Sequence, residues 1–247
     1  MSLPRSALPD SFGAVAAARR GLDVDLSDPR VAAFAEQFAT DVSVIDDTMR
    51  AAFLEATGPE AFSAVQAIYV DDFWPRASAV LGTQPTGAEA GELWPALEEF
   101  MREVARLDAL DPVTTELVRL RGARQHHCRV CTSRRSVAAI AGGADEATFA
   151  AVDRYADSDL PGHAKAALAL TDAIIWTPYD VSDEVLEAAR THLTDEQLVE
   201  VVLDVTRNAA NKIAVALGAD AATATEGVEL FTTDADGNLA IVGADPR

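Results

Sequence analysis

Apolar residues recur every three or four positions along most of the chain, which is the spacing of one buried face of an α-helix. In the first half, this pattern predicts a helix over residues 31–57, a second over 59–70 and a short third over 74–82, each ended by glycine or proline. We also expect a short helix over 12–20. Residues 82–91 are rich in Gly, Pro and Thr, which predicts a linker.

The second half is predicted to be helical as well, and several helix ends carry local signals. Asp111 and Pro112 have the pattern of an N-cap followed by proline at the first helical position. Thr194 and Gln197 form a capping-box pattern ahead of a long apolar stripe that ends at Gly218. The remaining apolar patterns predict helices over 93–104, 112–120, 137–141, 145–152, 163–176 and from Ser182 onward.

The end of the chain breaks the helical pattern. Two β-rich runs, 228–233 and 238–242, flank Asp234-Ala-Asp-Gly and predict a small β-hairpin. A lone hairpin is marginally stable in water, so we expect it to lie against the helical body or a neighbouring subunit. The predicted fold class is therefore all-α with a small C-terminal β-hairpin. We divide the chain into an N-terminal helical extension (1–105), a helical core (106–225) and the hairpin with its tail (226–247).

Composition and charge exclude several classes of function. The chain has 40 Asp and Glu against 20 Lys and Arg, a net charge of -20, and such a field repels nucleic acid and anionic membranes. No apolar run approaches the roughly 20 residues of a membrane-spanning helix. The first residues lack the apolar core of a secretory signal. We therefore expect a cytoplasmic protein with neither a nucleic-acid nor a membrane partner.

The chain has only two cysteines, Cys128 and Cys131. Because the cytoplasm is reducing, a static structural disulfide is not expected there, and a CxxC indicates a redox-active pair or half of a metal site. Residues three apart on a helix share one face, so the two side chains can close a disulfide. The thiolate is the reactive form, and nearby cations favour it.

Residues 117–144 contain no Asp or Glu, although the chain as a whole is acidic. This local excess of positive charge would favour a thiolate and attract an anionic partner. The arginines can also pair with acids elsewhere on the fold, and neither account excludes the other. Glu116 is the last acid before the stretch, and a buried carboxylate near a thiol can act as a general base. The basic residues of the stretch are Arg119, Arg121, Arg124, Arg129, Arg134 and Arg135, with His126 and His127 beside them.

Glu116, followed twelve residues later by Cys128 and then by Cys131, resembles the E…CxxC pattern of the AhpD-like alkylhydroperoxidases in the carboxymuconolactone decarboxylase superfamily. Residues 194–218 are similar to the family's final long helix, in which a polar Asn-Lys or Asn-Arg pair interrupts an apolar stripe. The resemblance covers about residues 105–225. It implies an AhpD-like all-α helical bundle, assembly into trimers or hexamers, and thiol-dependent reduction of hydroperoxides without a cofactor.

The resemblance also implies roles for individual residues. Glu116 helps to draw a proton from the thiol pair, and Cys131 attacks the peroxide oxygen and becomes a sulfenic acid. Cys128 then condenses with it to a disulfide, in agreement with the general course of cysteine oxidation. A dithiol reductant, which the sequence does not identify, must reopen that disulfide.

Two positions depart from the family pattern. Arg135 stands where the peroxidases have a histidine four residues after the second cysteine, and Val130 stands where they often have another. An arginine can stabilise a thiolate but does not shuttle protons near neutral pH. His127, or else His126, is the remaining candidate for a proton relay.

Other functions remain open alongside peroxide reduction. Zinc binding would use His126, His127, Cys128 and Cys131, which are suitable ligand types. A decarboxylase-like enzyme of the same superfamily would use the basic stretch to hold the carboxylate of a lactone acid. A non-catalytic oligomeric protein would carry the CxxC as a vestige. Residues 1–105 are expected to cover a surface that shorter relatives bury between subunits, which predicts a homo-oligomer smaller than a hexamer, a dimer or trimer.

Overall fold

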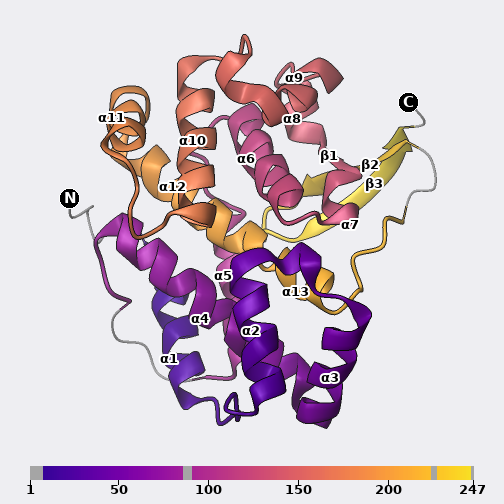
Figure 1. Cartoon of the computed structure of the whole chain (residues 1–247). Helices are drawn as coiled ribbons and strands as arrows, with labels where there is room; N and C mark the ends of the chain where they lie inside the picture. The colour runs from indigo at the N-terminus through magenta and orange to yellow at the C-terminus, as the bar shows by residue number, and fades with distance from the viewer. Residues whose placement is uncertain (1–7, 86–90, 224–226, 246–247) are drawn as a thin grey trace.

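A computed structural model describes residues 8–85, 91–223 and 227–245 of the chain. Figure 1 shows that helices form most of this structure, with one small sheet near the C-terminus. The prediction of an all-α protein with a small C-terminal hairpin is therefore confirmed. Among the described helices, none has the length and apolar character that a membrane crossing requires.

The first half has its helix breaks at places other than those that the apolar pattern predicted. The helix expected over 31–57 is interrupted by a 3₁₀ turn at Val42–Val44. The carboxylate of Asp41 accepts a hydrogen bond from the backbone of Ser43 at 2.9 Å, and Asp46 caps the next helix, so side chains end one helix and start another. The helices are α1 (Asp10–Gly21), α2 (Pro29–Asp41), α3 (Asp47–Thr57), α4 (Ala61–Leu81) and α5 (Leu93–Val104), with a second 3₁₀ turn at Gly58–Glu60.

Helix α4 runs without a break through Pro75, so the prediction of two separate helices there is wrong. Proline removes one backbone hydrogen bond, which leaves the carbonyl of Asp71 without its helical partner. Both Pro75 and Asp71 are exposed, and water can bind that carbonyl. The neighbouring residue Trp74 is buried and donates from Nε1 to the carbonyl of Phe12 at 2.9 Å, which ties this part of the helix to α1.

The second half follows the predicted helix ends closely. Asp111 accepts hydrogen bonds from the backbone of Val113 and Thr114, and the capping box of Thr194 and Gln197 is formed. The stripe predicted to continue to Gly218 is interrupted at Ala210, where three-residue turns replace the helical bonds. The helices are α6 (Pro112–Gln125), α7 (Arg129–Thr132), α8 (Val137–Ala141), α9 (Glu146–Ala150), α10 (Gly162–Trp176), α11 (Asp183–His192), α12 (Asp195–Ala209) and α13 (Asn211–Ala216), with a 3₁₀ segment at Ala151–Asp157.

Helix α12 is the centre of the fold. Residues 198–206 are buried on every side of the helix, and α12 packs against α4, α5, α6 and α10. In Figure 1, α12 lies between the N-terminal helices and the pair formed by α6 and α10. One continuous apolar cluster joins Phe34 and Trp74 of the N-terminal helices to Val202 of α12. The N-terminal helices and the CxxC-containing half therefore share a core.

The small sheet contains the predicted hairpin and one strand that the sequence pattern did not indicate. Strands β2 (Val228–Thr233) and β3 (Leu239–Asp245) pair antiparallel, as predicted. Strand β1 (Arg134–Ser136) pairs parallel with β2, in the order β1-β2-β3. The hairpin is thereby attached to the segment that directly follows Cys131.

Asp204 is a buried acid in the central helix. Its Oδ2 atom has no hydrogen-bond partner among the described residues, and burial raises its pKa to about 8. Asp204 is therefore protonated in the folded protein at neutral pH and ionised in the unfolded chain. The stability that this protonated group contributes is complete below about pH 4 and is lost as the pH rises toward 8.

We predict that an Asp204→Asn variant removes this dependence on pH. Between about pH 5 and 7, the free energy of unfolding of the wild type should fall relative to the variant by up to about 1.4 kcal/mol per pH unit. Chemical denaturation at several pH values measures both curves. The exposed Asp180→Asn variant is the control and should follow the wild type. Parallel curves for wild type and Asp204→Asn would contradict the prediction.

Candidate redox site

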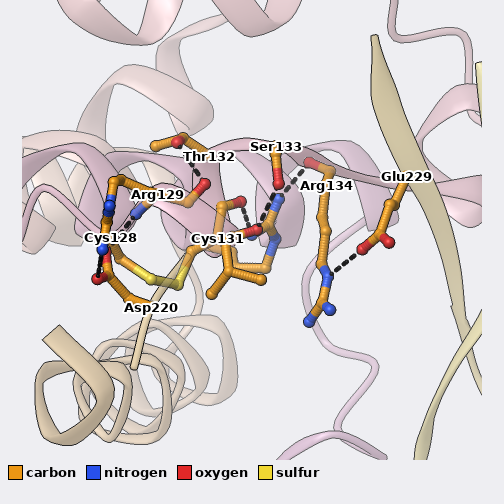
Figure 2. Close-up of a disulfide and its surroundings, with 10 residues drawn as sticks. Cys128, Arg129, Cys131, Thr132, Ser133, Arg134, Asp220 and Glu229 are labelled. Atoms are coloured by element: carbon orange, nitrogen blue, oxygen red, sulfur yellow. Dashed lines mark hydrogen bonds and ion pairs between the residues drawn. A yellow bond between two sulfur atoms is a disulfide. The ribbon is translucent and has the colours of Figure 1, made fainter. Parts of the chain in front are cut away.

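Cys128 and Cys131 are joined by a disulfide in the structure, with their Cα atoms 5.3 Å apart (Figure 2). The sequence suggested that both cysteines lie within one helix, but the structure places them differently. Cys128 occupies the N-cap position of the short helix α7, and Cys131 lies within that helix. The Cα separation is in the ordinary range for a disulfide, so this backbone brings the two sulfurs together without a long loop.

A tight turn after α6 places Cys128. His127 has a positive φ of 53°, which reverses the chain direction directly before the CxxC. The backbone N–H of Cys128 then donates to the carbonyl of Ala123 at 2.9 Å, back on α6. The start of the motif is therefore fixed against the helix that precedes it.

Asp220 holds the same end of the motif from the other side (Figure 2). Its carboxylate is almost completely buried and accepts from the backbone N–H of Arg129 at 2.9 Å and from the Arg129 guanidinium at 2.6 Å. Its carbonyl oxygen accepts from the N–H of Val130 at 2.9 Å. The hydrogen bonds from Arg129 hold the pKa of Asp220 below its ordinary value, so Asp220 remains a charged acceptor.

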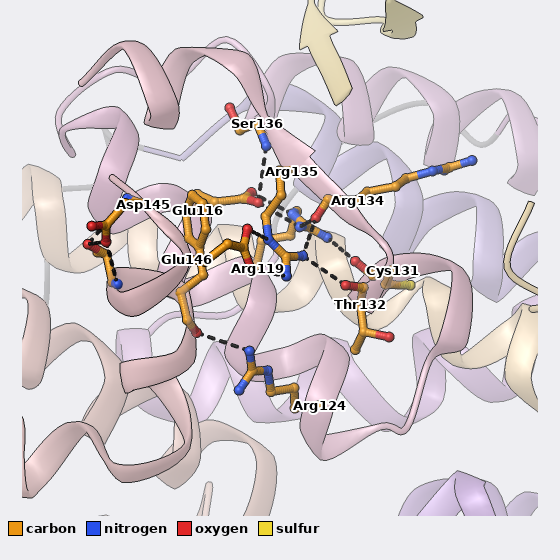
Figure 3. A network of polar contacts seen from close by, with 12 residues as sticks. Glu116, Arg119, Arg124, Cys131, Thr132, Arg134, Arg135, Ser136, Asp145 and Glu146 are labelled. Atoms are coloured by element: carbon orange, nitrogen blue, oxygen red, sulfur yellow. Dashed lines mark hydrogen bonds and ion pairs between the residues drawn. The ribbon is translucent and has the colours of Figure 1, made fainter. Parts of the chain in front are cut away.

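Glu116 and Arg119 hold the far end (Figure 3). The buried Glu116 carboxylate accepts two hydrogen bonds from Arg119, at 2.6 and 2.7 Å, and a third from the backbone of Ser136 at 3.2 Å. Arg119 in turn donates to the carbonyl oxygens of Cys131 at 2.8 Å and of Arg134 at 2.9 Å. Glu116 thus reaches the CxxC through Arg119, which binds the backbone rather than a sulfur.

Arg135, which stands at the family's histidine position, also holds the backbone here. It donates to the carbonyl of Thr132 at 2.8 Å and pairs with Glu146 at 3.1 Å. Its guanidinium lies over the ring of Phe149, and its side chain is buried. Arg135 therefore helps to hold the end of α7 in place through the carbonyl of Thr132.

Every arginine of the basic stretch forms an ion pair with a carboxylate. Of the two accounts left open by the sequence, pairing with acids elsewhere is the one observed, so the stretch as a whole is neutralised. The pairs are Arg119 with Glu116, Arg121 with Asp172, Arg124 with Asp153, Arg129 with Asp220, Arg134 with Glu229 and Arg135 with Glu146.

A cavity of about 310 Å³ lies beside Cys131. Cys131 is 4% exposed and lines this cavity, whereas Cys128 is fully buried and does not. Two cavity arginines, Arg102 and Arg207, come from outside the basic stretch and were missed by sequence reasoning. The one sequence signal for Arg207 was its position in the last turn of the apolar stripe of α12, where a charged residue interrupts the apolar pattern. The lining consists of Glu98, Met101, Arg102, Arg119, Val130, Cys131, Arg134, Arg207, Asn208, Ala210, Asn211, Phe231, Gly237, Asn238 and Leu239.

Neither histidine near the motif lines this cavity. His127 lines a different cavity of about 340 Å³, together with Arg129 and Asp220. His126 is buried against Phe73, and burial lowers its pKa well below the ordinary value, so it is neutral. The structure therefore gathers Cys128, Cys131, Glu116 and Arg135 around one segment, whereas His127, although it directly precedes Cys128, lies outside the cavity that Cys131 lines. Within the described ranges, no three His, Cys, Asp or Glu side chains form a group that could hold a metal ion.

The C-terminal hairpin forms one wall of the cavity, through Phe231, Asn238 and Leu239. Its loop lies against the end of α5, where Arg106 donates to the carbonyl of Asp236 at 2.9 Å. Gly237 has a φ of +85°, and a Cβ there would clash with the backbone of Arg102. Glycine is therefore required for the hairpin to approach α5 this closely.

Comparison with known proteins identifies relatives of the chain. A Mycobacterium tuberculosis protein of strain H37Rv, named Uncharacterized protein Rv2313c, is 43% identical over 222 residues, which are 84% of this chain and 78% of the relative. Its counterpart in strain CDC 1551, Uncharacterized protein MT2376, gives the same values. The chain belongs to the family of these mycobacterial proteins.

A Bacillus subtilis protein, Uncharacterized protein YdfG, is 28% identical over 126 residues, which are half of this chain and 86% of the relative. No family model and no solved structure matches the chain.

We predict that Gly237→Ala releases the hairpin loop from α5. Because alanine is strained at this φ and its Cβ would overlap the Arg102 backbone, the free energy of unfolding should fall by about 1 kcal/mol or more. Chemical denaturation measures the loss, and limited proteolysis should cleave the hairpin faster. Gly243→Ala, in the same hairpin but with open space around it, is the matched control and should leave both measurements unchanged.

A second prediction concerns the buried pair of Glu116 and Arg119. Glu116→Gln should destabilise the fold by about 1–3 kcal/mol, because it weakens buried charge-assisted hydrogen bonds. Glu99 and Arg102 form the same pair at the same spacing, but the Glu99 side chain is 46% exposed against 2% for Glu116. Glu99→Gln should therefore cost less than about 1 kcal/mol. Equal losses in chemical denaturation would show that burial of the pair has no effect.

Proposed function

We propose that the protein is a thiol-dependent peroxidase that reduces organic hydroperoxides through a Cys128–Cys131 dithiol-disulfide cycle, in the manner of the AhpD-like alkylhydroperoxidases. The observation that carries the proposal is the joined cysteine pair beside a cavity that Cys131 alone of the two lines. Such a cycle needs an attacking cysteine that the substrate can reach and a resolving cysteine beside it. Cys131, which lines the cavity, suits the first role, and the buried Cys128 suits the second.

The cycle balances in three steps. The Cys131 thiolate attacks the outer peroxide oxygen and the O–O bond breaks, which gives a sulfenic acid and an alkoxide that takes up a proton from solvent. The Cys128 thiol condenses with the sulfenic acid, forming the disulfide and releasing water. A dithiol reductant then reopens the disulfide by exchange and is itself oxidised. A reducing compartment such as the cytoplasm suits this last step.

Glu116 acts in this proposal as a positioning residue. Its two carboxylate oxygens already accept hydrogen bonds from Arg119 and Ser136, and Arg119 binds the carbonyl of Cys131. Arg207 lines the cavity beside Cys131 without an ion pair among the described residues, and a cation near a cysteine favours its thiolate. The proposed chemistry therefore needs no histidine relay.

The proposed assembly is a homo-oligomer smaller than a hexamer, a dimer or trimer. The N-terminal helices α4 and α5 cover one side of the central helix α12 within the chain itself. Because α4 and α5 already cover this side of α12, no second subunit is needed to bury it.

The direct test exposes reduced protein to one equivalent of tert-butyl hydroperoxide and follows mass and free thiols. We expect the mass to fall by two hydrogens and both thiols to disappear, at a rate well above that of free cysteine. In Cys128→Ser the reaction should stop at the sulfenic acid, with one oxygen gained, and Cys131→Ser should not react. The reverse result for the two variants would overturn the role of Cys131. Thiols that react no faster than free cysteine would favour a protein with an unused CxxC.

A further inference from the structure

The cavity beside Cys131 is lined by more arginines than acids, although the protein as a whole is strongly acidic. Among the charged residues that line it, four are arginines and one, Glu98, is an acid. In the whole chain, acids outnumber basic residues by 40 to 20. The four arginines come from four different elements: Arg102 from α5, Arg119 from α6, Arg134 from β1 and Arg207 from α12.

Arg207 differs from the other three. Arg102, Arg119 and Arg134 are each paired with a glutamate, at 2.8, 2.6 and 2.9 Å respectively. Arg207 donates from Nε to the carbonyl of Met101 at 2.9 Å and forms no ion pair with any residue that the structure describes. Its guanidinium remains charged, because arginine does not lose its proton in proteins.

No carboxylate of the described residues lies within ion-pair distance of Arg207, although Glu98 lines the same cavity. Asp204, one turn earlier on α12, is the acid that acts most strongly on it, but the raised pKa of Asp204, about 8, leaves that acid protonated at neutral pH. Burial lowers the pKa of Arg207, which reflects the cost of keeping its charge there. A cation that is largely buried without a partner is unfavourable unless an anion joins it.

The rest of the lining indicates the size and kind of that anion. Asn208, Asn211 and Asn238 offer neutral amide donors and acceptors, while Phe231 and Leu239 supply apolar surface. A volume of about 310 Å³ is at the lower end of the range for small-molecule sites. The guanidinium presents parallel N–H groups that match the two oxygens of a carboxylate. These features together suit a compact organic molecule with one carboxylate and an apolar body.

We propose that this cavity binds a small organic carboxylate through Arg207, and that the substrate of the peroxidase is a hydroperoxide carrying such a carboxylate. This proposal rests on the function proposed above and names its substrate class. With its carboxylate on Arg207, the substrate directs its peroxide group to Cys131 on the same cavity. The Cys131 thiolate takes the outer oxygen, the O–O bond breaks, and the product alcohol retains its carboxylate.

A binding experiment on the oxidised protein tests the site without any thiol chemistry. Isovalerate and its neutral amide, isovaleramide, differ only in the charged group. In calorimetric titrations, isovalerate should bind at least about tenfold more tightly than isovaleramide, and Arg207→Gln should remove that preference. Arg154→Gln, a fully exposed arginine elsewhere on the surface, is the control and should retain it. Equal affinity of the wild type for acid and amide would overturn the proposal even if Arg207→Gln failed to fold.

A kinetic experiment tests the substrate class. The tertiary hydroperoxide of isovalerate is tert-butyl hydroperoxide with one added carboxylate, so the two form a matched pair. The wild type should prefer the carboxylated compound in kcat/KM, and Arg207→Gln should lower that preference about tenfold or more, whereas Arg207→Lys should restore part of it. A preference unchanged by Arg207→Gln would overturn the role of Arg207. Isovalerate binding without any peroxidase activity would instead contradict only the function proposed above.

Discussion

The backbone of the CxxC segment is held from both ends by charged groups that are themselves buried. Asp220 accepts from the N–H groups at its start, and Arg119, which is paired with Glu116, donates to the carbonyl of Cys131 at its end. Buried ion pairs add little net stability, because the cost of removing two charges from water offsets their attraction. Their main effect here is positional. The Cα atoms of the cysteines lie 5.3 Å apart, within the ordinary range for a disulfide.

The positive charge near the cysteines has a different origin from the one that the sequence suggested. All six arginines of residues 117–144 are matched by acids, several of them distant in the chain, such as Asp172 and Glu229. Among the arginines that line the cavity, Arg207 on the central helix is the one that forms no ion pair with a described residue. A run of arginines in a sequence therefore measures local composition, whereas the field at a site depends on which carboxylates the fold brings to each of them.

Sequence reasoning succeeded where the signal was local and failed where partners came from far along the chain. The caps at Asp111 and Thr194 and the hairpin depend on residues a few positions apart, and they were predicted. Helix α4 continues through Pro75 because tertiary packing outweighs the lost hydrogen bond. Strand β1 exists only because β2, more than ninety residues later, pairs with it. The cysteines and Glu116 were found from their spacing, but Asp220 and Arg207 were not, since only the fold brings them to the motif.

The attachment of the hairpin links the lining of the cavity to the position of Cys131. Two residues after Cys131, the carbonyl of Ser133 accepts the N–H of Glu229 at 2.8 Å, and the Glu229 carboxylate binds Arg134 at 2.9 Å. The strand that carries Glu229 also carries Phe231, which lines the cavity. The backbone that places Cys131 is therefore joined to the strand that places Phe231 in the lining of the cavity. Because one set of hydrogen bonds joins the Cys131 segment to the strand that carries Phe231, the hairpin side of the cavity and Cys131 are positioned together by the fold.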